Sequence, residues 1–380
     1  MRIHSHVVRL KPYVSRHTIS YAKSVQHSQR WSTIRTRCAV VISCGVLLAA
    51  CGSPQSDSDV STTIVSPDDT TNPFVPQPIE WQPCSDGSAT TNISCGFIEV
   101  PFDYENLDQG SFVLYIKRRA ATDASLRIGS LLVNPGGPGF GGSSMADDAE
   151  YYFSSTLLQY FDIIAWDPRG TGKSTPYVDC VDQYDQYFGL DSPPDTPAEK
   201  QALIDAGAQF DKKCEEGSGS ILPYISTRSS ATDMNTIREA LGEDKISYFG
   251  FSYGSELGAT WVTLFPNTVR AAVLDGAVDP NSTALEEGIS QATGFEQQLN
   301  AFLASCAKTP TCGFYNGGNP QTALDDLLRV IDQTPLVVRA DRTAVTQGVM
   351  FTAIAQAIYS DSLWPQLDSA LTLAQKGDGS

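Results

Sequence analysis

The chain has 380 residues, of which 41% are hydrophobic and 18% are charged. This composition is that of a globular protein, and the length suffices for one large domain or for two. The formal net charge is −17, but residues 1–50 hold eight of the 26 Lys and Arg and no acidic residue. The remainder therefore has 18 basic and 43 acidic residues, a net charge of −25. So acidic a body argues against a nucleic acid partner, because phosphate binding requires a basic surface.

Residues 1–50 are predicted to be a signal peptide. Arginines precede the apolar run Cys38–Ala50, which is too short to span a bilayer as a helix but suits the hydrophobic region of a signal. The run ends in Leu-Ala-Ala-Cys51, which resembles the bacterial lipobox, whose cysteine is lipidated and becomes the new N-terminus. We therefore expect an exported lipoprotein that contacts the membrane only through Cys51. The alternative is a generic signal peptide with a chance cysteine.

Residues 51–78 are rich in Ser, Thr, Asp and Pro and show no apolar period. They are predicted to be a flexible tether. Residues 79–279 are predicted to form the front part of an α/β core, because short β-type runs alternate with helical stretches. The predicted strands are Cys95–Pro101, Ser111–Lys117, Gly129–Val133, Phe161–Trp166, Ile246–Phe251 and Val269–Leu274. The predicted helices are Ser143–Leu158, Asp233–Leu241 and Tyr253–Leu264.

Residues 280–380 are predicted to form a helical cap, truncated at its end, because the strand signal fades after Asp279. The predicted cap helices are Ala284–Cys306, Gln321–Gln333, Gln347–Tyr359 and Leu363–Lys376.

Six cysteines follow Cys51: Cys84, Cys95, Cys180, Cys214, Cys306 and Cys312. An even number in an exported chain indicates disulfides. We favour sequential pairing, because each successive pair lies within one local segment. Zinc binding is the alternative, but there is no Cys-x-x-Cys spacing and no histidine in the body of the chain. No metal or other cofactor is expected.

The sequence Gly250-Phe251-Ser252-Tyr253-Gly254 matches the G-x-S-x-G pattern, with a predicted strand before it and a predicted helix after it. This is the strand–turn–helix setting in which a serine nucleophile is exposed at a helix N-terminus. The backbone N–H of Tyr253 then points at the oxyanion. A plain helix start with a capping serine is the alternative interpretation.

A glycine-rich loop, Asn134-Pro-Gly-Gly-Pro-Gly139, follows the predicted strand Gly129–Val133. A tetrahedral intermediate needs two fixed N–H donors, and the second comes from the loop after an earlier strand. Gly136 or Gly137 is placed to supply it, and we choose Gly137. The loop could also be an ordinary tight turn.

The segment Asp167-Pro-Arg-Gly-Thr-Gly-Lys-Ser174 is partly similar to a phosphate-binding loop. That pattern requires a glycine five residues before Gly172, where this chain has Asp167. We interpret the segment as a structural turn.

The segments GGPG, DPRGTGKS, GFSYGSELGATWVTLFP and VLDGAVDP resemble the tripeptidyl-aminopeptidase and proline-iminopeptidase branch of the α/β-hydrolases. The chain is especially similar to the secreted or lipoprotein tripeptidyl aminopeptidases of actinobacteria, from about Trp81 onward. The resemblance implies a mostly parallel sheet with a helical cap, and a Ser–Asp–His triad that cleaves short peptides from free N-termini. Carried over, Ser252 is the nucleophile, and Gly137 and Tyr253 form the oxyanion hole.

One departure from the family pattern is large. In this fold the triad acid and histidine follow the serine, but all four histidines, from His4 to His27, precede the predicted cleavage site. We expect the closing strands that carry the acid and histidine to be absent from these 380 residues. Asp275 and Asp279 are expected to be structural, and Glu286 and Glu287 are candidates by position for binding a substrate amino group.

Three hypotheses follow. The first is a truncated or frameshifted aminopeptidase, inactive or impaired as it stands. The second is a non-catalytic surface lipoprotein. The third is an esterase on the same fold, because the elbow does not distinguish amides from esters.

Overall fold

The computed structural model describes residues 74–85, 92–279, 281–338 and 342–380. The predicted signal peptide, the lipidation site Cys51 and most of the predicted tether lie outside the described residues. No helix in these ranges combines the length and the apolar character needed to cross a membrane.

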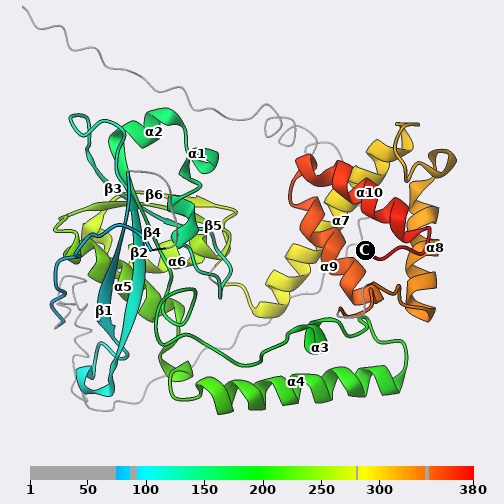
Figure 1. Ribbon diagram of the computed structural model, residues 1–380, viewed down its shortest axis with the longest axis horizontal. Coiled ribbons are helices and arrows are strands. Elements are labelled where there is room, and N and C mark those ends of the chain that lie inside the picture. The colour runs from blue at the N-terminus through cyan, green and yellow to red at the C-terminus, as the bar shows by residue number, and fades with distance from the viewer. Residues whose placement is uncertain (1–73, 86–91, 280, 339–341) are drawn as a thin grey trace, which may run out of the picture. The chain divides into compact units, whose positions relative to one another are not determined.

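The core is built on a six-stranded sheet with the order β1-β2-β4-β3-β5-β6 (Figure 1). Strands β3, β4, β5 and β6 run parallel, whereas β1 and β2 are antiparallel to their neighbours. The strands are β1 Ile93–Pro101, β2 Ser111–Arg119, β3 Gly129–Asn134, β4 Phe161–Trp166, β5 Ile246–Phe251 and β6 Val269–Asp275. The mostly parallel sheet predicted from the sequence is confirmed.

Both faces of the sheet are buried in its centre. Along β3, Leu132 belongs to one apolar cluster, which includes Met234 of helix α5 (Thr227–Ala240) and Trp261 of helix α6 (Tyr253–Leu264). Its neighbours Leu131 and Val133 belong to another cluster, with residues of the short segments η4 (Ser143–Ala146), α1 (Ala149–Tyr152) and α2 (Ser155–Tyr160). Because successive side chains of a strand point to opposite faces, the continuous apolar run is covered on both.

The single helix predicted over Ser143–Leu158 is wrong. The structure has η4, α1 and α2 in its place, separated at Phe153. Phe153 is extended (φ −126°, ψ 143°), and its buried side chain joins the cluster beneath β3 and β4. Ser154 then starts α2 by accepting a hydrogen bond from the N–H of Leu157. Burial of the Phe153 ring and the N-cap at Ser154 together stabilise this break more than a continuous helix would be stabilised by its apolar pattern.

Between β4 and α5 lie α3 (Asp185–Phe188) and α4 (Pro197–Ser218), which were not predicted from the sequence. Helix α4 buries only Ser218, so it lacks the apolar face on which periodicity depends. A capping signal was present, however: Thr196 and Glu199 form a capping box and Pro197 is the first helical residue. The two N-terminal signals alone could have located this helix.

Residues 284–374 form a helical unit with its own apolar core (Figure 1). Its helices are α7 Ala284–Ala307, α8 Pro320–Gln333, α9 Gln347–Ile358 and α10 Trp364–Ala374. The four helices predicted for the cap are therefore present, with ends shifted by a few residues. Phe314, Ile331 and Leu371 are fully buried in this core, which indicates a packed unit.

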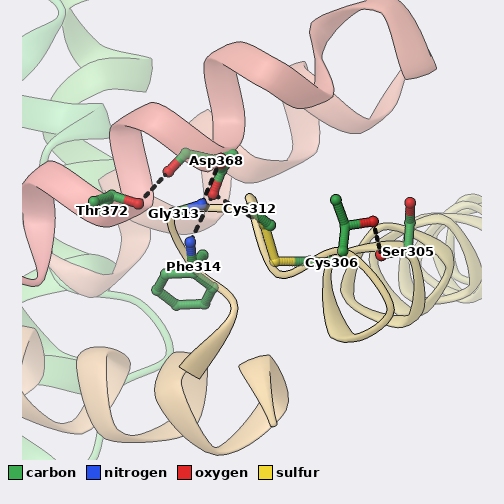
Figure 2. Close-up of a disulfide and its surroundings, with 8 residues drawn as sticks. Ser305, Cys306, Cys312, Gly313, Phe314, Asp368 and Thr372 are labelled. Atoms are coloured by element: carbon green, nitrogen blue, oxygen red, sulfur yellow. Dashed lines mark hydrogen bonds between the residues drawn. A yellow bond between two sulfur atoms is a disulfide. The ribbon is translucent and has the colours of Figure 1, made fainter. Parts of the chain in front are cut away.

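The three disulfides expected from local pairing form: Cys84–Cys95, Cys180–Cys214 and Cys306–Cys312. Figure 2 shows the last of them, where α7 ends. Beside it the Asp368 carboxylate of α10 accepts hydrogen bonds from the N–H groups of Gly313 (2.9 Å) and Phe314 (2.8 Å). The bridge and this carboxylate together fix the turn between α7 and α8.

Strand β6 is paired on one edge only within the described residues, with β5. Six of its seven residues, Arg270, Ala271, Ala272, Val273, Leu274 and Asp275, are exposed, although four of these are apolar. Val273 is 47% and Leu274 37% exposed, whereas every residue of β3 is buried. The sheet thus has an apolar, uncovered strand next to the one that leads into Ser252.

Candidate active site

Ser252 occupies a sharp turn between β5 and α6. Its backbone has φ 52° and ψ −125°, a conformation that residues with a side chain rarely adopt. The turn is fixed by a hydrogen bond from the N–H of Ser252 to the carbonyl of Asp275, at the end of β6 (2.8 Å). Ser252 is exposed, and although it stands at the N-cap position its side chain makes no capping bond. The strained turn therefore exposes the Ser252 hydroxyl, which does not cap the helix.

The glycines on either side of Ser252 are required by close packing. A methyl group on Gly250 would overlap the carbonyl oxygen of Gly254, to which the phenol of Tyr248 also donates (2.7 Å). A methyl group on Gly254 would lie 2.9 Å from Asn134 Oδ1. The G-x-S-x-G pattern is thus explained by strand, turn and helix lying in contact.

The glycine-rich loop lies against this turn. Asn134 is paired with Gly250 across β3 and β5, so the loops that follow the two strands meet at one edge of the sheet. A methyl group on Gly136 (φ 99°) would lie 2.6 Å from Phe251 O and 2.9 Å from Ser252 Cβ. The N–H of Gly136 donates to Asn134 Oδ1 (2.9 Å). Gly136 therefore makes the contact with the turn, but its own N–H is already used.

The residues that follow Gly136 and Ser252 in the chain, Gly137 and Tyr253, each have a backbone N–H group that is unused among the described residues. Within the part of the chain that the structure describes, neither the N–H of Gly137 nor that of Tyr253 donates a hydrogen bond. Tyr253 is the first residue of α6, where backbone N–H groups lack intrahelical acceptors and carry the positive end of the helix dipole. Both N–H groups are therefore free to donate to a ligand within the described structure.

The loop is held from behind by Asp167, which is buried. Its carboxylate accepts from the N–H of Ser143 (2.8 Å), just after the loop, and from that of Lys173 (2.8 Å). The Ser174 hydroxyl donates to the carbonyl of Asp167 (2.6 Å). The segment 167–174 is therefore the structural turn predicted from the sequence, and it braces the glycine loop.

Residues 129–316 match the family model described as alpha/beta hydrolase fold. The chain belongs to the α/β-hydrolase family. Over 317 residues, 79% of this chain and 60% of the relative, it is 33% identical to serine protease Hip1 of Mycobacterium tuberculosis. It is 36% identical over 228 residues to the tripeptidyl aminopeptidase of Streptomyces coelicolor, covering 57% of this chain and 42% of that protein.

A third relative, carboxylesterase B of M. tuberculosis, is 33% identical over 317 residues, 80% of this chain and 60% of the relative. This α/β-hydrolase chain thus spans about 60% of the length of the curated relatives that it matches most extensively. All three relatives have the name of a hydrolase, and two of the names describe an enzyme that acts on peptides or proteins.

A general base for Ser252 is not found among the described residues of this hydrolase. No histidine follows His27 in the sequence. Asp275 contributes its backbone carbonyl to the N–H of Ser252, and no hydrogen bond joins its carboxylate to the serine hydroxyl in the described structure. A protonated serine hydroxyl is a weak nucleophile, and the described residues do not supply a group that would activate it.

The two glutamates considered for a substrate amino group begin α7. Glu286 accepts from the N–H and hydroxyl of Thr283 in a capping box, and these bonds hold the pKa of its carboxyl below the usual value. Its carboxylate is thus used at the helix start. Glu287 is exposed.

One group of potential metal ligands is present in the described ranges: Cys306, Cys312 and Asp368. The two sulfur atoms are bonded to each other, and the carboxylate accepts backbone N–H groups (Figure 2). In this oxidised form the group does not fit a metal ion, because a disulfide sulfur is not a thiolate ligand.

The fit of Gly136 against the turn leads to a test with a matched control. Gly136 and Gly139 have nearly the same backbone conformation (φ 99° and 96°), but a methyl group on Gly139 would meet nothing within 4 Å. Both alanine variants therefore carry similar backbone strain, and only Gly136→Ala pushes the loop away from Ser252. We expect Gly136→Ala to slow the reaction of Ser252 with a fluorophosphonate by about a hundredfold relative to Gly139→Ala, since a misplacement of about 1 Å has an effect of this size. Equal rates in the two variants would contradict the assigned loop position.

Proposed function

We propose that this protein is an exported serine peptidase that releases short peptides from free N-termini through an acyl-enzyme on Ser252. The observation that carries the proposal is the strained, uncapped Ser252, which is followed by the unused N–H of Tyr253 and contacted by the glycine loop at Gly136. Ser252 attacks the carbonyl carbon, and the N–H groups of Gly137 and Tyr253 stabilise the oxygen as it becomes negative. The peptide substrate and the free N-terminus are suggested by the tripeptidyl aminopeptidase relative.

We further propose that the base acting on Ser252 comes from a part of the protein outside these 380 residues. The relatives are longer, and the uncovered apolar strand β6 is the edge to which further strands would add. Such strands would cover Val273 and Leu274 and bring an acid and a histidine close to Ser252. The chain by itself would then be impaired rather than fully active.

Export is supported by the three disulfides, which form and persist in oxidising compartments. We propose that a lipid on Cys51 anchors the protein to the outer face of the cell membrane. A single acyl chain binds a membrane only marginally, so the anchor needs the several chains of a bacterial lipoprotein. No nucleic acid partner is proposed, given the acidic charge.

The peptidase proposal is tested by the acyl-enzyme itself. Without a histidine to activate water, an acyl group on Ser252 is expected to persist long enough to be weighed. The chain is treated with an alanyl tripeptide p-nitrophenyl ester in the presence of imidazole. The Ser252 oxygen bonds to the carbonyl carbon, p-nitrophenolate leaves, and the serine proton passes to imidazole. Intact-protein mass spectrometry should find one tripeptidyl group on the chain and none on Ser252→Ala.

Specificity is measured by competing esters. An N-acetylated tripeptide ester is expected to acylate more slowly, because it lacks the ammonium group of a free N-terminus. Equal acylation by both peptides, with faster acylation by a butyryl ester, would reject an aminopeptidase. That outcome would favour the esterase, a second candidate that the carboxylesterase B relative supports. A chain that is acylated by none of them would instead fit a non-catalytic surface protein.

A further inference from the structure

A cavity of about 460 Å³ lies in the core beside the glycine loop. Its walls come from the loop (Gly136, Phe140), from the start of α5 and the residues before it (Ile225, Ser230), and from Tyr253 of α6. The exposed ring of Phe140 stands at the loop, with 70% of its surface accessible. The volume is within the range of sites that hold small organic groups.

The cavity adjoins the reacting centre. Gly136, which lines it, lies against Phe251 and Ser252, and Tyr253, which also lines it, directly follows Ser252. The N–H of Tyr253 is one of the two proposed oxyanion donors. Ser252 itself lines another hollow, of about 780 Å³, and the cavity borders the site of the nucleophile through Gly136 and Tyr253.

The walls of the cavity are apolar or neutral. The apolar residues are Pro138, Phe140, Pro168, Val178, Ile225 and Leu257, and the hydroxyl-bearing ones are Thr171, Tyr184, Ser226, Thr227, Ser230 and Tyr253. No Asp or Glu is among the lining residues. The phenol of Tyr253 is hydrogen-bonded to Thr227 (2.9 Å), and burial raises its pKa, so this group stays uncharged.

The single cation in the wall, Arg169, has no donor left for a ligand. Its Nε and one Nη bind the two carboxylate oxygens of Asp233, at 2.8 and 2.6 Å. Its remaining N–H groups donate to the carbonyls of Pro101, Phe102 and Tyr224. A guanidinium has five N–H donors, and all five are thereby used. The cavity thus offers neither a free charge nor a counter-charge.

We infer that this cavity is a subsite for the uncharged, apolar side chain of the substrate residue that adjoins the scissile carbonyl. A carboxylate or ammonium side chain would lose its hydration there without gaining a partner. The free ammonium of an aminopeptidase substrate must accordingly be bound elsewhere. The inference rests on the proposed function only in taking the bound group to be part of a peptide.

The inference is tested by binding, which does not depend on turnover. Four N-acetyl amino acid amides, those of leucine, phenylalanine, aspartate and lysine, are titrated into the chain and followed by saturation-transfer NMR. The leucine and phenylalanine compounds are expected to bind at least about tenfold more tightly than the two charged ones. Equal binding of all four would overturn the inference.

Variants then locate the binding. Ser230→Phe fills the cavity from the buried face of α5 and should abolish binding of the leucine compound. Thr263→Phe puts the same ring on the exposed face of α6 and should leave it unchanged. Should Ser230→Phe fail to fold, Phe140→Ala removes an exposed ring from the wall and should weaken binding about three- to tenfold. Unchanged binding in the cavity variants would overturn the inference.

Ser252→Ala separates this inference from the proposed function. The variant should bind the leucine compound like the parent chain, since the hydroxyl is not part of the cavity wall. If Ser230→Phe abolishes binding of the leucine compound while no acyl-enzyme forms on Ser252, the subsite is supported and the peptidase proposal fails. If the acyl-enzyme forms but shows no preference among side chains and no response to Ser230→Phe, the subsite fails alone.

Discussion

Phosphonylation of Ser252 in this chain by a fluorophosphonate is expected to be slow and to depend on added base. With no histidine after His27, the serine proton has to pass to hydroxide or to a buffer molecule. The rate should rise about tenfold per pH unit between about pH 7 and pH 9, without the plateau that an imidazole of pKa about 6.5 would produce. It should also rise in proportion to added free imidazole.

The effect is large because a triad acts as a unit. Removing its serine or histidine costs roughly 10⁶ in turnover, while the oxyanion hole and binding retain about 10³–10⁴ over water. The matched control is Ser252→Ala, which should not react under any of these conditions. A rate that is already fast at pH 7 and insensitive to imidazole would mean that the chain contains a base of its own, and it would refute the proposed external base.

Replacement of Arg169 by alanine is expected to lower the free energy of unfolding by about 3–5 kcal/mol. Arg169 and Asp233 are completely buried, and their closest atoms are 2.6 Å apart. Tyr104 also donates to Asp233 (2.7 Å). Burial lowers the pKa of the Arg169 guanidinium, but the charge of Asp233 and its hydrogen bonds outweigh that and raise it. Without Arg169 the Asp233 carboxylate stays buried without a counter-charge, and three backbone carbonyls lose their donor.

Urea unfolding followed by circular dichroism measures this change. The control is Arg329→Ala, because Arg329 forms an ion pair with Asp326 in which both side chains are about 60% exposed. That variant should change stability by no more than about 0.5 kcal/mol. Equal losses of unfolding free energy in the two variants would show that the buried pair does not stabilise the packing of β1, the 167–174 turn and α5.

Those parts of the fold that depend on local pattern could be predicted from the sequence. The six strands are short runs rich in apolar and β-branched residues. The G-x-S-x-G turn needs its two glycines for contacts made within six residues along the chain and with the adjacent strand. Disulfide pairing was local as well. Apart from the contact with the adjacent strand, the residues that decide these features are close together in sequence.

Other features depend on residues far apart in sequence. Arg169 and Asp233 are 64 positions apart, and no periodicity in the sequence predicts that they pair. The break at Phe153 arises because its side chain is buried in the apolar cluster beneath the sheet. Tertiary contacts settle these points, so pattern alone could not.

The most direct test of the account is a crystal structure of the chain after fluorophosphonate has reacted with Ser252. We predict a phosphonyl oxygen within about 2.7–3.1 Å of the backbone nitrogens of both Gly137 and Tyr253, the range of effective oxyanion donors. A phosphonyl group on Ser252 whose oxygens contact neither nitrogen, or modification of another residue in place of Ser252, would contradict the assignment of the nucleophile and its oxyanion hole.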